Sequence, residues 1–472
     1  WQQEEQYEAK VNGTWPQRPL FTTKSLRINQ SDSSYLKKTF GTATNRRKYT
    51  YSFWCKKQYN TDMAILSTGA DSNNRGIMYF NNSGDFNFLE VTSGSTTAFV
   101  ATNRLFRDSS AWYHFVIAVD TTQATNTNRV KIYVNGIQET SLAQTTYMNQ
   151  NYDGNFNAGA RHDISSANGY GEDGYYWNGY LAEVVFIDGQ QLTPTSFGST
   201  NSDGVWIPAI YTGTFGNNGF NLQFENAAAL GTDSSPNGNT FTVNNLTSID
   251  QSTDYPVVNF ATLNSLCTGS LITLSEGNLK ATGNNASDSS TTTATIGITS
   301  GKFYWEAKIV NIVSGYPYLG IYQDFDSLVQ GVLEGGATGD RVMTVYIAAG
   351  STTLVKPSTD LTITAPTTND IIMFAVDKDN NKFYMGVNGT WYNSGNPTSG
   401  ATGTGSLADL DANGVVMFGS HNYNNSATEL NFGSPSFAIS SGNTDGNGYG
   451  NFEYAVPSGY YSLNTKNLGE FG

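Results

Sequence analysis

The sequence predicts an all-β chain with two antiparallel β-sandwiches in tandem behind an extended N-terminal arm. Of its 472 residues, 49 are glycine, 14% are charged and 13% are aromatic. This composition is typical of short strands joined by polar turns and differs from that of helix bundles. The 26 Phe, 28 Tyr and 8 Trp residues supply enough apolar surface to exclude a disordered chain. After residue 10 we find almost no amphipathic helical pattern.

Residues 1–20 form the predicted arm. The segment WQQEEQYEAK is compatible with a short helix, which Gly13, Pro16 and Pro19 then interrupt. Its aromatic residues lack periodicity, which indicates docking on the chain's own body or on a neighbouring subunit. These candidate docking residues are Trp1, Tyr7 and Trp15.

The first sandwich is predicted over residues 21–208. In KYTYSFWCKK, alternate residues from Tyr49 to Cys55 are apolar or aromatic, as on one face of a strand. The apolar run WYHFVIAVD (112–120) is typical of a strand buried on both faces. The Asn-Gly pair that ends KIYVNG (131–136) predicts a tight hairpin, because both residues readily take positive φ.

The second sandwich is predicted over residues 256–472 and includes a C-terminal extension. Strands are expected in GKFYWEAKIV (301–310) and on both sides of a polar turn at 377–382. Between the sandwiches, residues 209–255 are less regular and are predicted as a connector. They either complete the first sandwich or bridge the two.

Charge and cysteine content exclude several classes of protein. The formal net charge is −14 and the pI is about 4.6, whereas a nucleic-acid-binding protein usually carries a basic face. Cys55 and Cys267 are far apart and belong to no metal-binding motif, so neither a disulfide framework nor a cysteine metal site is expected. No apolar run is long enough to span a membrane. We therefore expect neither nucleic acid nor membrane insertion.

Catalytic motifs are missing, and the sequence predicts a non-enzymatic protein. Glycosidases of sandwich folds carry a Glu-x-Asp-x-x-Glu strand, which does not occur here. Glu183 and Asp188 are five residues apart, which places them on opposite faces of a strand. No G-x-S-x-G motif is present. His114 lies in an apolar strand and is expected in the core, while His162 and His421 are expected in loops.

Aromatic residues in loops are the main candidates for ligand binding. The segment NGYGEDGYYWNG (168–179) combines aromatic rings, which can stack on sugars, with acids that can accept sugar hydroxyls. Its candidate residues are Tyr170, Glu172, Asp173, Tyr175, Tyr176 and Trp177. The alternative is that Tyr176 and Trp177 open the next strand and pack locally.

The first sandwich resembles the LamG/concanavalin A-like family. SLRINQSDSSYL (25–36), YTYSFWCKK (49–57), WYHFVIAVD (112–120), KIYVNG (131–136) and NGYLAEVVFIDGQQLTP (178–194) carry the resemblance. It implies a jelly-roll sandwich. Relatives often hold Ca²⁺ at the sandwich rim, and the oxygen donors available here are Asp153, Asp163, Glu172 and Asp173. These acids match no family metal motif, and simple solvated loop acids are the alternative, so no cofactor is assigned.

The second sandwich resembles SPRY domains. GKFYWEAKI (301–309), YLGIY (318–322), DIIMFAVDKDNNKFYMGVNG (370–389) and TELNFGSPSF (428–437) carry this resemblance. SPRY domains bind protein partners through loops, which makes Trp391, Tyr392 and Tyr423 candidates here, near Tyr316 and Tyr318. Several of these aromatic residues are also compatible with a core or subunit interface.

The two units are joined by NFATLNSL (259–266) and LSEGNLKATG (274–283), and GYYSLNTKNL (459–468) follows the second unit. This tandem arrangement resembles bacteriophage virion proteins. The resemblance implies a tail fibre or appendage that binds a host-surface glycan or protein. It also implies an oligomer that docks on other virion proteins through the arm, is assembled in the host cytoplasm and resides in the extracellular particle. A capsid decoration or head/tail structural component is the alternative, and a glycan-active enzyme ranks third.

Overall fold

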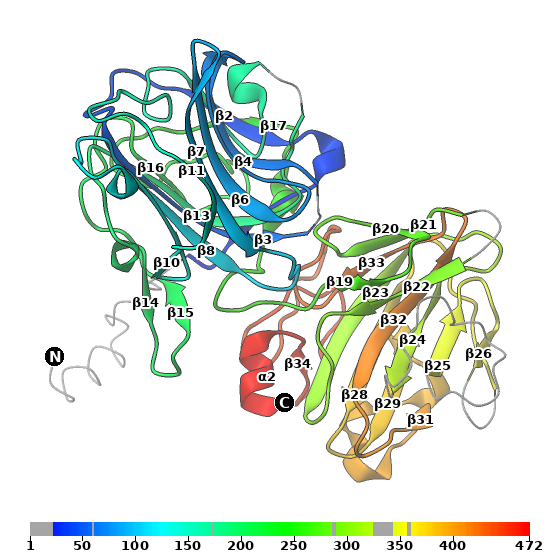
Figure 1. Ribbon diagram of the computed structural model, residues 1–472. Helices are drawn as coiled ribbons and strands as arrows, with labels where there is room; N and C mark the ends of the chain where they lie inside the picture. The colour runs from blue at the N-terminus through cyan, green and yellow to red at the C-terminus, as the bar shows by residue number, and fades with distance from the viewer. Residues whose placement is uncertain (1–21, 59–60, 172–173, 286–288, 324–342, 356–359) are drawn as a thin grey trace, which may run out of the picture.

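The computed structural model describes both predicted sandwiches (Figure 1). The described residues are 22–58, 61–171, 174–285, 289–323, 343–355 and 360–472. The predicted arm, with Trp1, Tyr7 and Trp15, lies outside them.

The first sandwich consists of two antiparallel sheets. One has the order β10 (Ile137–Gln138), β9 (Val130–Val134), β8 (Tyr113–Asp120), β3 (Lys48–Lys57), β13 (Gly179–Asp188), β1 (Ser25–Ile28) and β18 (Gln251–Ser252), and β16 (Phe220–Leu222) also pairs with β13. The other has the order β11 (Leu142–Thr146), β7 (Ser95–Leu105), β6 (Asp85–Thr92), β5 (Asn74–Phe80), β4 (Met63–Asp71), β12 (Arg161–Ile164), β2 (Tyr35–Thr39) and β17 (Thr242–Asn244). A separate hairpin, β14 (Gly198–Thr200) and β15 (Trp206–Pro208), projects beside them (Figure 1).

The second sandwich has the same two-sheet plan. One sheet has the order β19 (Leu263–Thr268), β22 (Ser289–Ala294), β32 (Val416–Tyr423), β24 (Tyr318–Gln323), β25 (Met343–Ala348), β26 (Thr353–Val355) and β27 (Leu361–Thr362). The other has the order β20 (Ile272–Ser275), β21 (Lys280–Gly283), β33 (Ala427–Asn431), β23 (Lys302–Asn311), β28 (Ile371–Asp377), β29 (Lys382–Val387) and β30 (Thr390–Trp391). β31 (Ala408–Asp409) pairs with β29, and β34 (Tyr461–Ser462) pairs with β23 in parallel.

Helices contribute little to the described part of the chain. It contains one α-helix, α2 (Thr465–Phe471), and short 3-10 turns. The turns are Gln30–Asp32, Asn126–Asn128, Asn168–Tyr170, Pro194–Ser196, Ser248–Asp250, Tyr392–Ser394 and Pro397–Thr402. None of these described helices is long and apolar enough to cross a membrane. The predicted all-β fold is confirmed.

The hydrophobic pattern places the predicted strands correctly. The alternate residues from Tyr49 to Cys55 on β3 all lie in the main core of the first sandwich. On β8, Phe115 faces this core while its neighbour Val116 packs in a second cluster on the opposite face of the sheet, so the strand is buried on both sides as predicted. Burying each such apolar side chain contributes on the order of 1.5–3 kcal/mol.

The Asn-Gly turns also agree with the prediction. Asn135 and Gly136 have φ of 48° and 81° and connect β9 to β10. Asn388 and Gly389, with φ of 46° and 84°, connect β29 to β30 in the same way. Both central residues take the left-handed conformation that a tight hairpin requires.

Of the two alternatives for residues 209–255, the structure shows the first, because the segment completes the first sandwich. Its segments form β16, β17 and β18, which extend the two sheets by pairing with β13, β2 and β1 respectively. Short strands of three, three and two residues give too weak a periodic signal to be assigned from sequence alone.

A buried ion pair joins the segment just after β18 to the central strand β3. Lys56 Nζ on β3 lies 2.8 Å from Asp254 Oδ2, and both side chains are almost fully buried. Lys56 also donates to Asn259 Oδ1 (2.7 Å) and to the carbonyl of Phe260 (3.2 Å), at the start of the second sandwich. Trp112 Nε1 donates to the other carboxylate oxygen of Asp254 at 3.0 Å. One lysine thus connects a central strand of the first sandwich to the chain that enters the second.

We expect the Asp254→Ala variant to lose about 3–5 kcal/mol of unfolding free energy, because it leaves the buried Lys56 charge unpaired. Urea unfolding followed by tryptophan fluorescence measures this change. The control is Glu470→Ala, which breaks the exposed pair with Lys466 and is expected to cost under about 0.5 kcal/mol. Equal effects of the two changes would contradict the structural role of Lys56.

Glu90 is a second buried charge, and it lies inside the core of the first sandwich. Its Oε1 accepts hydrogen bonds from the backbone of Asn155 (3.0 Å) and Phe156 (3.3 Å) and from Tyr49 Oη (3.4 Å). Its Oε2 has no partner among the described residues. Burial raises the pKa of Glu90 to about 7, although these hydrogen bonds oppose the shift.

The free energy of unfolding should therefore fall as the pH rises from about 4.5 to about 7. In this range the folded protein retains the proton on Glu90, whereas the unfolded chain releases it. A shift of this size corresponds to about 3 kcal/mol for Glu90. Glu90→Gln should remove this contribution to the pH dependence of the unfolding free energy. Asp203→Asn, at the exposed tip of the β14–β15 hairpin, should leave that pH dependence unchanged. Thermal unfolding at half-unit pH steps measures both slopes. Identical slopes for Glu90→Gln and the unmodified chain would exclude the assignment.

Candidate functional site

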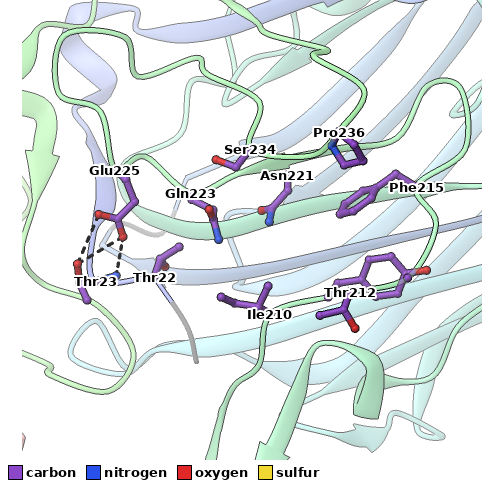
Figure 2. Close-up of a pocket in the computed structure, with 12 residues that line it drawn as sticks. Thr22, Thr23, Ile210, Thr212, Phe215, Asn221, Gln223, Glu225, Ser234 and Pro236 are labelled. Carbon is purple, nitrogen blue, oxygen red and sulfur yellow. Dashed lines mark hydrogen bonds between the residues drawn. The ribbon is translucent and has the colours of Figure 1, made fainter. Parts of the chain in front are cut away.

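A pocket of about 650 Å³ opens on the first sandwich beside β16 (Figure 2). The start of β1, the segment before β16 and the end of β16 surround it. We call it the Asn221 pocket, and its lining residues are Thr22, Thr23, Ile210, Tyr211, Thr212, Gly213, Phe215, Asn221, Gln223, Glu225, Ser234 and Pro236.

A bulge in β13 lies beside this pocket. The pairing of β13 with β3 shifts register between Ala182 and Val185, and Glu183 within the bulge has a φ of 46°. As a result, β1 pairs with β13 on one side of the bulge and β16 pairs with it on the other. Bulges bend a strand and redirect its side chains. The ends of β1 and β16 therefore meet at Glu183.

Two carboxylates hold the chain at this meeting point. Glu183 Oε1 accepts the backbone N–H of Thr22 at 2.8 Å, and Glu225 Oε1 accepts that of Thr23 at 2.8 Å. Glu225 is exposed at one end of the pocket (Figure 2). Burial raises the pKa of Glu183, and the nearby Glu225 raises it further. These contacts fix the strand that forms one wall.

Asn221 supplies an unpaired acceptor in the wall of the pocket. Its backbone is held by Asp233 Oδ1, which accepts the Asn221 N–H at 2.8 Å. Asn221 is 3% exposed, yet its Oδ1 has no hydrogen-bond partner among the described residues. A buried acceptor left without a donor costs about 1–3 kcal/mol, so such groups in native proteins usually have a specific reason.

An aromatic corner closes the opposite end. The Tyr211 ring packs edge-on against Phe215 with centroids 5.1 Å apart and stacks on Phe197 at 5.4 Å. Tyr211 Oη donates to the carbonyl of Thr214 at 3.0 Å, which orients the ring. Together with Asn221, Gln223 and Glu225, this corner gives the pocket an aromatic end and an amide and carboxylate end.

The structure does not place the predicted cluster at 168–179 in one binding surface. Trp177 is fully buried and packs on Phe80 with ring centroids 5.7 Å apart, so its assignment as a ligand contact is wrong. Tyr170 is also buried, under the guanidinium of Arg75, and cannot offer a free face. Glu172 and Asp173 lie outside the described residues.

Two tyrosines of this segment remain accessible. Tyr175 is 38% exposed and has a φ of 51°, while its carbonyl accepts the N–H of Ala64. Tyr176 is half-buried, accepts a hydrogen bond from Asn168 Nδ2 and packs against Tyr35. These two residues remain candidates without a surrounding pocket.

In the second sandwich, Tyr423 belongs to an aromatic cluster on β24 and β32. Tyr316 stacks on Tyr318 with centroids 4.5 Å apart and lies 5.3 Å from Tyr423 and 5.6 Å from His421. Trp391 is half-buried and lies away from this cluster, against Tyr304. Tyr392 is buried in the core, so its assignment as a ligand contact is wrong.

The histidines have structural surroundings. His114 stacks between Trp54 (4.7 Å) and Trp206 (6.0 Å), accepts the Trp206 Nε1–H at Nδ1, and has a pKa lowered to about 3 by burial. The core prediction for His114 is thus confirmed. His162 and His421 were predicted in loops, but both lie buried on strands, β12 and β32. Short irregular sequences around both residues concealed these strands.

Of the acids considered for Ca²⁺, the two that the structure describes each form an ion pair. Asp153 pairs with Arg47 at 2.9 Å, and Asp163 pairs with Arg161 at 2.6 Å. The described residues bring no three acids, histidines or cysteines together as a metal site. Asp188, which was considered with Glu183 as a carboxylate pair, is buried and accepts hydrogen bonds from Thr44, Asn157 and Asn218. Both cysteines are free, Cys55 buried and Cys267 exposed.

Comparison with known proteins finds one family model that matches part of the first sandwich. Residues 30–196 match the model of the concanavalin A-like lectin/glucanases superfamily. The predicted LamG/concanavalin A-like domain is confirmed for this part of the chain. The comparison with curated proteins found no match.

Similar solved structures share low sequence identity with the chain. The SPRY domain of human HERC1 is 16% identical, with a TM-score of 0.27, covering 36% of this chain and 96% of that one. A heptameric SAP-like pentraxin from Limulus polyphemus is 18% identical, with a TM-score of 0.29 and coverage of 37% and 80%. A candidate carbohydrate-binding protein from Bacteroides ovatus is 15% identical, with a TM-score of 0.32 and coverage of 48% and 61%. The SPRY assignment of the second sandwich stays a prediction.

None of the residues that line the Asn221 pocket was predicted from the sequence as a site residue. They come from residues 22–23 and 210–236, and the second segment was predicted only as a connector. The cluster of Asn, Thr, Ser and Gly in this segment is also typical of ordinary turns.

We expect Asn221→Leu to raise the unfolding free energy by about 1 kcal/mol, because it removes a buried acceptor that lacks a donor. The matched control is Asn239→Leu, which removes two hydrogen bonds from Nδ2, to the carbonyls of Asn217 (3.0 Å) and Gly219 (2.9 Å). The control should lose about 1–2 kcal/mol. Urea unfolding compares the two variants. A similar loss in both would mean that Asn221 is fully paired in the folded protein.

Proposed function

We propose that this chain is a non-enzymatic binding component of a bacteriophage virion, and that its Asn221 pocket holds part of a host-surface glycan. The observation that carries the proposal is a pocket large enough for a sugar residue, lined by amide, hydroxyl and carboxylate side chains with an aromatic corner at one end.

The remaining lining of the pocket suits the same ligand class. Gln223 offers both a donor and an acceptor, Thr212 and Ser234 offer hydroxyl groups, and Glu225 accepts hydrogen bonds. Tyr211 and Phe215 add apolar area at one end. Sugars present both hydroxyl groups and C–H faces, so an aromatic corner beside amides is complementary to them.

The virion role rests on the tandem order of a LamG-like and a SPRY-like sequence. We propose an appendage such as a tail fibre, which docks through its N-terminal arm on other virion proteins, forms an oligomer and faces the host surface. The acidic charge of the chain keeps such an exposed particle component soluble. Capsid decoration uses the same folds for binding between subunits, and the test below includes that outcome.

Ser234→Trp should weaken glycan binding at least tenfold, because the new indole occupies the pocket while Ser234 itself is exposed and easily replaced. The measurement is binding of the full chain to an array of bacterial O-antigens and capsular polysaccharides. The control is Ala412→Trp at an exposed turn of the second sandwich.

Three outcomes would contradict the proposal. Absence of binding to any polysaccharide favours the decoration alternative. Equal binding by Ser234→Trp and Ala412→Trp places the glycan elsewhere on the chain. Release of new reducing ends from a bound polysaccharide would show an enzyme.

A further inference from the structure

We infer that the Asn221 pocket is one end of a groove that crosses from the first sandwich to the second and takes an extended, uncharged polysaccharide. This inference rests on the proposed function and deepens it, since it specifies a polymer that contacts both sandwiches. Two further hollows carry the argument.

The second hollow lies where the sandwiches meet, and we call it the junction hollow. Its volume is about 450 Å³. One wall belongs to the first sandwich and includes Lys24, Ser248 and Gln251, and the other belongs to the second sandwich and includes Pro435 and Ala438.

Two links connect the junction hollow with the Asn221 pocket. Thr23 lines the pocket and is followed directly by Lys24, which lines the junction hollow. Gln251 lines the junction hollow and donates from Nε2 to the carbonyl of Phe224 at 2.6 Å. Phe224 stands between two residues that line the pocket, Gln223 and Glu225. The two spaces are therefore neighbours, and an extended ligand that occupies both passes over the residues between them.

The third hollow, of about 360 Å³, continues the path onto the second sandwich and includes Lys308 of β23. It shares Phe437, Ala438 and Ile439 with the junction hollow. Lys308 lies over the Phe437 ring, with Nζ 5.5 Å from its centroid. Three consecutive residues thus form one side of both hollows.

Arg27 holds the two walls of the junction hollow together. It is 1% exposed, and its Nη1 donates to the carbonyl of Pro435 at 2.9 Å while Nη2 donates to that of Ile249 at 2.8 Å. Pro435 and Ile249 line opposite walls. The width of the groove is set before any ligand arrives, and such preorganisation lowers the entropic cost of binding.

The chemistry of the lining selects an uncharged polymer rich in hydroxyl groups. Side-chain amides and hydroxyls recur in all three hollows, among them Asn221, Gln251 and Asn388. Charges of both signs are few and mixed, which does not suit a polyanion such as nucleic acid. Every lining residue lies outside residues 30–196, so the groove is separate from the segment that matches the lectin superfamily.

The test uses the full chain and a neutral O-antigen polysaccharide that binds on the array, cut into fragments of increasing length. Isothermal titration measures the affinity of each fragment. We expect the affinity to rise with length until the fragment spans all three hollows. Ala438→Trp, an exposed residue that lines two hollows, should weaken the longest fragment at least tenfold and leave the shortest fragment unchanged. Ala412→Trp is the matched control.

The outcomes separate this inference from the proposed function. If short fragments bind, Ser234→Trp abolishes their binding and Ala438→Trp leaves the long fragment unaffected, the groove is wrong and the pocket stands. If no polysaccharide binds, both are wrong. If only extended peptides from a parallel peptide array bind, and Ala438→Trp blocks them, the groove is real but its ligand is a protein segment, which overturns the polysaccharide assignment.

Discussion

The buried pair between Lys56 and Asp254 holds the two sandwiches in one arrangement. Asp254 ends the strand region of the first sandwich, and Lys56 reaches past it to Asn259 and Phe260, where the second sandwich begins. Two charges removed from water are costly unless each is fully paired, and here the carboxylate also accepts the Trp112 N–H. The pair itself lies within the first sandwich, and a different packing of the two sandwiches would remove the hydrogen bonds of Lys56 to Asn259 and Phe260.

The candidate binding surface depends on this arrangement. Arg27 bonds to Ile249 on one side and to Pro435 on the other, and Tyr180 Oη donates to the carbonyl of Gly277 in the second sandwich. Gly277 has a φ of 74° and leaves no space for a side chain beside that hydroxyl. These contacts place the walls of the junction hollow at a fixed distance. Binding in a tandem protein of this kind can thus belong to the pair of sandwiches, with neither sufficient alone.

Long strands were predicted correctly from the sequence, and very short strands were not. Strands such as β3 and β8 are long, and their alternating or continuous apolar residues identify them without further information. The three short strands between residues 209 and 255 carry almost no such signal, and they are held by pairing with strands distant in the sequence. The predictions for aromatic loop residues failed for a related reason. Trp177 and Tyr392 are of the residue types that line sugar-binding sites, but both are buried in the core.

The all-β fold, the two sandwiches and the Asn-Gly hairpins were predicted from local patterns of apolar residues and turns. The concanavalin A-like prediction rested on a resemblance, and residues 30–196 match the model of that superfamily. The candidate site depends on contacts between distant segments. The Asn221 pocket lies where the start of β1 and the end of β16 meet beside the bulge at Glu183, across about 200 residues of chain. An unpaired acceptor is also invisible in a sequence, because whether Asn221 finds a donor depends on every neighbour that folding places around it.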